Sequence, residues 1–178
     1  MILGLDISTS ITGYSILDAS GKIIKTGHWD FRNKNNFQNI FEKAHATKGN
    51  LSKIKNGYDI KHIFIEPALH MFAPGKSSAK TLSTLTKFNG IVSWFCYEIF
   101  MIEPEYIPAV SARKKCGITI KRGKTAKGQV LRFLLDFEPD FNVEYTKFGN
   151  PKPYCYDEAD SLIIAKAGHE CLKEKLKS

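Results

Sequence analysis

The chain has 178 residues, of which 43% are hydrophobic and 25% are charged. This composition is typical of a globular protein that forms its core without disulfides. No run approaches the roughly 18 apolar residues of a membrane span, and the N-terminus lacks the basic start of a secretory signal. We therefore expect a single domain over residues 1–178, located in the cytoplasm, with no membrane partner.

Cysteine and histidine residues are scattered and form no metal-binding pattern. The four cysteines (Cys96, Cys116, Cys155 and Cys171) are far apart and never form a CxxC pair. We expect reduced thiols. The five histidines form no HxH or HxxxH pair, and we expect them to be surface or packing residues.

The net charge of +8 is concentrated in one part of the chain. Residues 106–135 contain no Asp or Glu but eight Lys and Arg, and the remainder of the chain is neutral. Such a segment is either a solvated basic face or a site for a polyanion, with nucleic acid as the natural partner. The candidate DNA-binding residues are Arg113, Lys114, Lys115, Lys121, Arg122, Lys124 and Lys127.

Short apolar runs between turn residues predict β-strands at 1–5, 11–17, 23–31, 62–65 and 106–108. The first three are joined by short polar turns, which favours an antiparallel meander. The fourth ends at Pro67, because proline cannot donate a hydrogen bond to a sheet.

Apolar residues at helical spacing predict helices at 37–55, 78–100, 111–116, 125–137 and 156–172. Thr125 is the expected cap of the fourth helix. The order of elements predicts an α/β fold in which helices pack on the faces of a mixed sheet.

Four acidic residues lie where packing does not require them. Asp6 follows one apolar strand and Glu66 ends another, while Asp157 and Asp160 are three residues apart on one helix face. Each has an ordinary explanation when taken alone; the helical pair, for instance, suits the positive end of the helix dipole. Mutually repelling carboxylates persist at one place mainly when a cation holds them, and all-oxygen ligands suit Mg²⁺ or Mn²⁺.

These acids and their surroundings resemble the RuvC family of Holliday junction resolvases, in the RNase H-like superfamily. The resemblance rests on GLDIST at 4–9, IFIE at 63–66 and DEADSL at 157–162, with further similarity at 88–92 and 124–130. It implies an RNase H-like fold: a mixed five-stranded sheet, with three antiparallel strands followed by parallel strands, flanked by helices. The Asn- and Lys-rich segment 33–58 differs from the bacterial enzymes, which suggests a phage-encoded or distant relative acting in a bacterial or phage-infected cell.

The resemblance also implies a site and a mechanism. The metal-binding carboxylates carry over to Asp6, Glu66, Asp157 and Asp160, which would hold two Mg²⁺ ions, or Mn²⁺ in their place, for two-metal phosphodiester hydrolysis. Lys124 or Lys127 could stabilise phosphate charge in the transition state. Glu158 is expected to point elsewhere.

The expected substrate is a four-way DNA junction, nicked symmetrically by a homodimer because a two-fold protein suits a two-fold substrate. Helix 78–100 is the candidate dimer face. The family inserts an apolar wedge into the junction, for which Leu69 and Phe72 are the candidates, with Met71 as a further one. Ordinary packing is the alternative for Phe72.

Four other functions stay open at this point. Two are nucleases with other substrates: a flap or fork nuclease, and an RNase H that acts on RNA–DNA hybrids. A third is a junction-binding protein that does not cut. The fourth is an actin-like ATPase, whose first hairpin begins similarly, but that fold needs two such lobes and this chain is too short for them.

Overall fold

The computed structural model describes residues 1–68, 78–121, 123 and 125–177. In this part of the chain, five strands form one mixed sheet in the order β3-β2-β1-β4-β5. The three N-terminal strands pair antiparallel, whereas β4 pairs parallel with β1 and β5 pairs parallel with β4. The predicted mixed sheet is thus confirmed. The strands are β1 (Ile2–Asp6), β2 (Ile11–Leu17), β3 (Ile23–Asp30), β4 (His62–Ile65) and β5 (Glu105–Tyr106).

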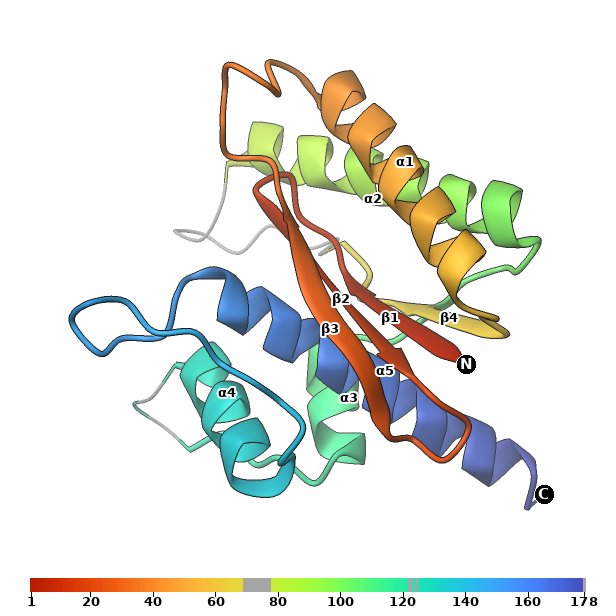
Figure 1. Ribbon diagram of the computed structural model, residues 1–178, viewed down its shortest axis with the longest axis vertical. Coiled ribbons are helices and arrows are strands. Elements are labelled where there is room, and N and C mark those ends of the chain that lie inside the picture. The colour runs from red at the N-terminus through yellow and green to blue at the C-terminus, as the bar shows by residue number, and fades with distance from the viewer. Residues whose placement is uncertain (69–77, 122, 124, 178) are drawn as a thin grey trace.

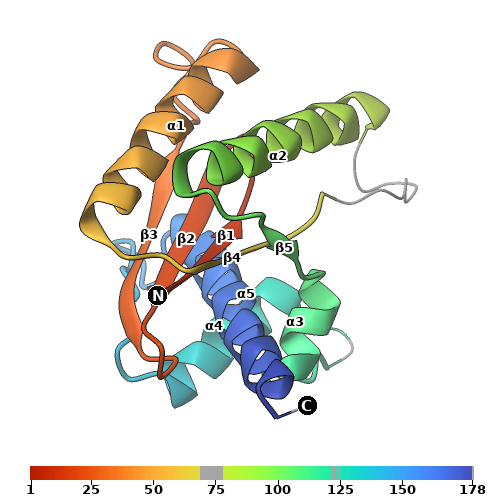
Figure 2. The same cartoon turned by 90° about the vertical axis from the view of Figure 1, so that its right-hand side faces the viewer.

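Helices cover both faces of this sheet and make it the middle of three layers (Figures 1 and 2). One face carries α1 (Ile40–Gly57) and α2 (Ala79–Phe100). The other carries α3 (Ala109–Lys115), α4 (Ala126–Phe137) and α5 (Tyr154–Lys175). None of the helices within the described ranges is long and apolar enough to cross a bilayer.

Most element boundaries differ from the sequence prediction by one to three residues, and three of these differences involve a cap or a proline. The first helix begins at Ile40 rather than at 37, because the Asn39 side chain accepts hydrogen bonds from the first backbone amides and caps it there. The fifth strand is Glu105–Tyr106 rather than 106–108, since Pro108 already precedes α3. The last helix starts directly after Pro153, two residues earlier than predicted.

Alternation along β1 and β2 divides their side chains between the two layers. Leu3 and Leu5 belong to the core shared with α1 and α2, whereas Ile2 and Leu17 belong to the core shared with α3, α4 and α5. Asp6 has the same parity as Ile2 and therefore points toward α5. The strand pattern that builds the two cores thus also aims this carboxylate at the helix layer.

Small residues on the same face allow α5 to lie very close to the sheet. A Cβ atom at Gly4 would lie 2.6 Å from the backbone nitrogen of Ala165, and one at Gly13 would lie 2.0 Å from the carbonyl oxygen of Asp157. The hydroxyls of Ser15 and Ser161 form a buried hydrogen bond of 2.8 Å at the same contact. These contacts set the height and rotation of α5 over β1 and β2.

The four cysteines are free thiols, as the sequence predicted.

Candidate active site

Asp6 and Glu66 stand at the carboxyl ends of two neighbouring parallel strands. Leu5 of β1 pairs with Ile65 of β4, and the backbone amide of Glu66 donates to the carbonyl of Leu5 at 3.0 Å. Adjacent strands are about 4.8 Å apart. The register therefore brings these two acids together although 60 residues of chain separate them.

The start of α5 supplies two further acids. Asp157 lies in the first turn, where its carbonyl rests over Gly13, and Asp160 follows almost one turn later. Because Gly13 has no side chain, this end of α5 reaches the strand ends that carry Asp6. Three of the predicted acids thereby come to line one cavity.

The cavity has a volume of about 160 Å³. Its lining combines three carboxylates from three elements with two cationic side chains and two small residues. These residues are Asp6, Glu66, Asp160, Arg113, Lys127, Ala109 and Ala126. Asp157 does not line the cavity but lies beside it, in contact with Lys127.

Burial and mutual repulsion perturb the cavity carboxylates. Burial raises the pKa of Asp6 well above its ordinary value, and the charges of Glu66 and Asp160 raise it further. The pKa of Glu66 is raised to about 7 by burial and by the nearby charge of Asp160. Burial likewise raises the pKa of Asp160, against the opposing charges of Lys127 and Arg113. Without a bound cation the cluster therefore retains protons at pH values where isolated carboxylates have lost them.

Lys127 is the cation most closely associated with these acids. Its Nζ atom lies 2.8 Å from Asp157 Oδ1 and 3.2 Å from Asp160 Oδ2. Burial disfavours the ammonium charge, but attraction by Asp6, Asp157 and Asp160 outweighs this effect and raises the pKa of Lys127. The lysine is therefore charged and offsets part of the negative charge of the cluster.

The donor set fits a divalent cation in its chemistry. Carboxylate oxygens gathered in one small cavity are the ligands that Mg²⁺ and Mn²⁺ prefer. Among the described residues, however, no three acidic, His or Cys side chains are oriented to hold one ion, and Lys127 bridges two of the acids. The carboxylates that would hold a cation are thus together, but two of them, Asp157 and Asp160, are paired with the lysine.

A partly buried hydrogen bond between His28 and Glu158, behind the cluster, was not predicted. His28 Nδ1 of β3 lies 2.6 Å from Glu158 Oε1, and the His28 ring stacks on Tyr154 with centroids 3.9 Å apart. Glu158 therefore points away from the cavity, as expected, and joins α5 to the sheet. A lone histidine gives no sequence signal, because its partner lies 130 residues away.

The structure divides the basic segment among several places. Arg113 and Lys127 line the cavity, whereas Lys114 and Lys121 are exposed. Lys115 forms an ion pair of 2.7 Å with Glu174, which lies about 20 Å along α5 from Asp160 at 1.5 Å per residue. The other candidate DNA-binding and wedge residues, Arg122, Lys124, Leu69, Met71 and Phe72, lie outside the described residues.

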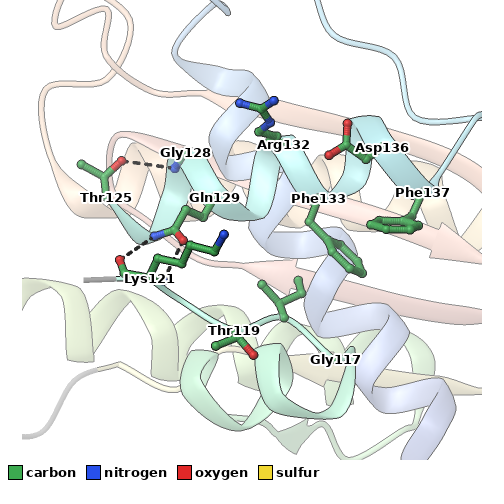
Figure 3. A pocket seen from close by; sticks show the side chains of 11 residues that line it. Gly117, Thr119, Lys121, Thr125, Gly128, Gln129, Arg132, Phe133, Asp136 and Phe137 are labelled. Carbon is green, nitrogen blue, oxygen red and sulfur yellow. Dashed lines mark hydrogen bonds between the residues drawn. The ribbon is translucent and has the colours of Figure 1, made fainter. Parts of the chain in front are cut away.

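A larger open cavity of about 850 Å³ separates α4 from residues 117–121 (Figure 3). The Gln129 side chain donates to the carbonyl of Lys121 at 3.2 Å and accepts from its amide at 2.8 Å. Phe133 and Phe137 lie side by side at the other end of the cavity (Figure 3). Gln129 thus joins the backbone of Lys121 to α4.

No protein-family model and no curated protein sequence matches the chain. Solved structures do match it along nearly its whole length. Thermus thermophilus RuvC in complex with a Holliday junction substrate has a TM-score of 0.69 at 10% identity, covering 97% of this chain and 94% of that one. Another structure of T. thermophilus RuvC has a TM-score of 0.66 at 12% identity, covering 98% and 96% of the two chains.

The yeast mitochondrial Holliday junction resolvase Ydc2 matches with a TM-score of 0.63 at 14% identity, covering 99% of this chain and 80% of that one. The chain therefore has the RNase H-like fold of the RuvC-type resolvases. The resemblance seen in the sequence is confirmed at the level of the fold.

Proposed function

We propose that this protein is a Mg²⁺-dependent endonuclease that nicks four-way DNA junctions. One observation carries the proposal: carboxylates from β1, β4 and α5 converge on one cavity, flanked by Arg113 and Lys127. The fold is that of proteins described as Holliday junction resolvases, one of them in complex with its junction substrate. Convergent acids with adjoining cations suit phosphodiester hydrolysis better than binding alone.

Each side chain has a distinct role in this proposal. Asp6, Glu66 and Asp160, together with Asp157, would hold the cations. A bound Mg²⁺ would supply an activated water and stabilise the departing oxygen. Lys127 and Arg113 orient the phosphate and offset its developing negative charge.

The direct test is cleavage of a synthetic four-way junction with Mg²⁺ by the wild type, Asp6→Asn and Glu66→Gln. We expect each variant to lose more than about 100-fold in cleavage rate. Replacing a residue that only orients the ligands of a metal already costs about 10- to 100-fold, and replacing a ligand should cost more. Asp59→Asn is the matched control, since the Asp59 carboxylate is exposed, forms an ion pair with Lys61 and does not line the cavity. Undiminished cutting by both active-site variants would refute the proposal.

Comparing the cleavage of four-way junctions, flaps, forks and RNA–DNA hybrids separates this function from its alternatives. A junction resolvase cuts the four-way substrate in preference to flaps, forks and RNA–DNA hybrids, and it makes two symmetric nicks. A broader branched-DNA nuclease or an RNase H reverses that order. A non-catalytic junction-binding protein binds the four-way substrate but leaves it intact at every Mg²⁺ concentration.

We also propose that the protein acts as a homodimer through α2. The inner face of this helix packs in the core through Phe88, Val92 and Cys96, while Trp94 on the helix is 60% exposed and Met101, directly after it, is 72% exposed. Light scattering is expected to give twice the chain mass of 20.1 kDa. Trp94→Glu should give the monomer mass with an unchanged circular dichroism spectrum, and a monomeric wild type would overturn this part.

A further inference from the structure

The chain between α4 and α5 forms a short hairpin over residues 144–152. Tyr145 and Pro151 form a β-bridge, and the amide of Lys152 donates to the carbonyl of Glu144 at 2.8 Å. At the tip, the amide of Gly149 donates to the carbonyl of Thr146 at 3.0 Å, with Gly149 in the left-handed region at φ 75°. Backbone hydrogen bonds therefore define the shape of this hairpin from base to tip.

The base of the hairpin is joined to the start of α5. Lys152 Nζ lies 2.6 Å from Glu144 Oε2, and the Cys155 thiol donates to the carbonyl of Glu144 at 3.6 Å. Tyr154, the first residue of α5, stacks on His28 of β3. Asp157 follows only three residues later, about 4.5 Å along the helix axis. The hairpin thus has a defined position relative to the catalytic candidates.

Two aromatic side chains at this hairpin are left in solvent. Phe148 is 77% exposed and Tyr145 is 52% exposed. Lys147 lies between them in the sequence, with its Nζ atom 5.0 Å from the centroid of the Phe148 ring. A single exposed apolar residue needs no explanation, but two aromatic rings and a lysine in one hydrogen-bonded hairpin form a defined surface.

The chemistry of this surface suits a nucleic acid strand. Residues 144–152 contain two lysines and one acidic residue, Glu144, which pairs with Lys152, so Lys147 is the lysine outside that ion pair. Aromatic rings beside lysines bind unpaired bases by stacking while the cations contact the phosphates. A neutral protein partner would not require a lysine next to the exposed aromatic rings.

The hairpin also lies next to the start of α5, which carries two of the candidate acids. It extends from the end of α5 that carries Asp157, on the β3 side, whereas α3 with Arg113 lies on the β5 side of α5 (Figures 1 and 2). The carboxylate cavity therefore has a cationic element on one side and the aromatic hairpin on the other.

We propose that the 144–152 hairpin is a DNA-contacting element in which Phe148 stacks on an unpaired base at the branch point while Lys147 contacts the adjoining phosphate. This inference rests on the proposed function, because it assumes that branched DNA is the substrate. It adds a contact surface formed by residues other than the acids, the basic segment and the predicted wedge.

The test compares Phe148→Ala and Phe148→Trp with Phe41→Ala, which removes a 74% exposed ring on the far face of the sheet. The probe is a synthetic four-way junction with 2-aminopurine at the branch point, titrated in EDTA so that binding is measured without cleavage. Phe148→Ala should weaken binding by about 5- to 100-fold, the range expected for loss of one stacked base. It should also abolish the 2-aminopurine quenching, while Phe148→Trp and Phe41→Ala leave both unchanged.

Fully paired duplex of equal length provides the second arm of this test. An equal loss of affinity for duplex and junction would overturn base stacking, as would wild-type junction binding by Phe148→Ala. A wild type that binds with quenching but never cuts with Mg²⁺ would refute the nuclease and leave the hairpin contact intact. Cleavage by the wild type together with normal binding by Phe148→Ala would refute only the hairpin contact.

Discussion

Lys127 and Asp157 form an ion pair that joins α4 to α5, with Nζ 2.8 Å from Oδ1. The same ammonium group lies 3.2 Å from Asp160 Oδ2, and its charge acts against the raised pKa of Asp6. A cation belonging to the protein thus occupies the surroundings in which we expect Mg²⁺ to bind. A bound Mg²⁺ would therefore compete with the lysine for Asp157 and Asp160.

Replacing Lys127 by Met should therefore tighten divalent binding and slow cleavage. Tighter binding follows because the competing charge is gone, and slower cleavage follows because the phosphate loses its ammonium partner. Isothermal titration with Mn²⁺ should give a Kd several-fold lower than that of the wild type, while the cleavage rate at saturating Mg²⁺ falls by about 10- to 1000-fold. Lys121→Met, which changes an exposed lysine outside the cavity, should leave the metal Kd unchanged. Weaker metal binding by Lys127→Met would contradict this competition.

The stability of the metal-free protein should decrease as the pH rises toward neutrality. In the folded state the pKa of Glu66 is about 7, against an ordinary value of 4.5. The folded state therefore holds more protons than the unfolded state between these two values, and the free energy of unfolding falls as the pH rises through this range. The contribution of Glu66 to that fall is up to about 3 kcal/mol.

Urea unfolding in EDTA at pH 5, 6 and 7.5 measures this effect. Glu66→Gln, which cannot titrate, should show a shallower pH dependence than the wild type and should be the more stable of the two at pH 7.5. Added Mg²⁺ should restore wild-type stability at pH 7.5 but do little at pH 5, where protons occupy the carboxylates. If the free energy of unfolding changed equally with pH in both proteins, a group other than Glu66 would be responsible for the pH dependence.

A methyl group at Gly13 should displace the start of α5. The added Cβ would lie 2.0 Å from the carbonyl oxygen of Asp157, and this neighbour is backbone, so it cannot rotate away. We expect Gly13→Ala to lower the free energy of unfolding by roughly 1–3 kcal/mol and to reduce cleavage strongly. Gly49→Ala is the matched control, because a Cβ there meets nothing within 4 Å. It should stabilise α1 by about 0.5–1 kcal/mol without affecting activity.

Removing the His28 ring should destabilise the protein through Glu158. His28→Ala leaves the Glu158 carboxylate buried without its 2.6 Å partner, which costs roughly 1–3 kcal/mol. A double-mutant cycle with Glu158→Gln should give a coupling free energy of about 0.5–3 kcal/mol in chemical denaturation. His62→Ala, at an exposed position, should change the free energy of unfolding by no more than about 0.5 kcal/mol. Additive effects of His28→Ala and Glu158→Gln would mean that the pair does not act as a unit.

The acids at the strand ends could be predicted from the sequence pattern around them. Asp6 and Glu66 were recognisable because each follows an apolar run, and the carboxyl ends of neighbouring parallel strands meet at one sheet edge. Asp157 and Asp160 were placed on one helix face by their spacing, but only Asp160 lines the cavity. The rotation of α5 separates the two, and the close approach at Gly4 and Gly13 sets that rotation.

The roles of the basic residues on helix α3 could not be predicted from the sequence pattern. Arg113 and Lys115 are two residues apart and equivalent in the sequence, yet one lines the cavity and the other pairs with Glu174 near the end of α5. Neighbouring positions on a helix are turned about 100° apart, so the packing of the helix decides which side chain reaches the acids. Charge composition identifies the basic segment, but it cannot show which of its side chains reach the cavity.

Apolar runs, helical spacing and the order of elements were thus sufficient to predict the α/β layers, the mixed sheet and the acids at its strand ends. Each strand, each helix and the position of an acid at its end depend on residues close in sequence. The pairing of Lys127 with Asp157, the His28–Glu158 pair and the exposed Phe148 on its hairpin required the folded chain. They depend on how helices pack on the sheet and on which surfaces stay uncovered. Neither property can be read from the spacing of residues along the chain.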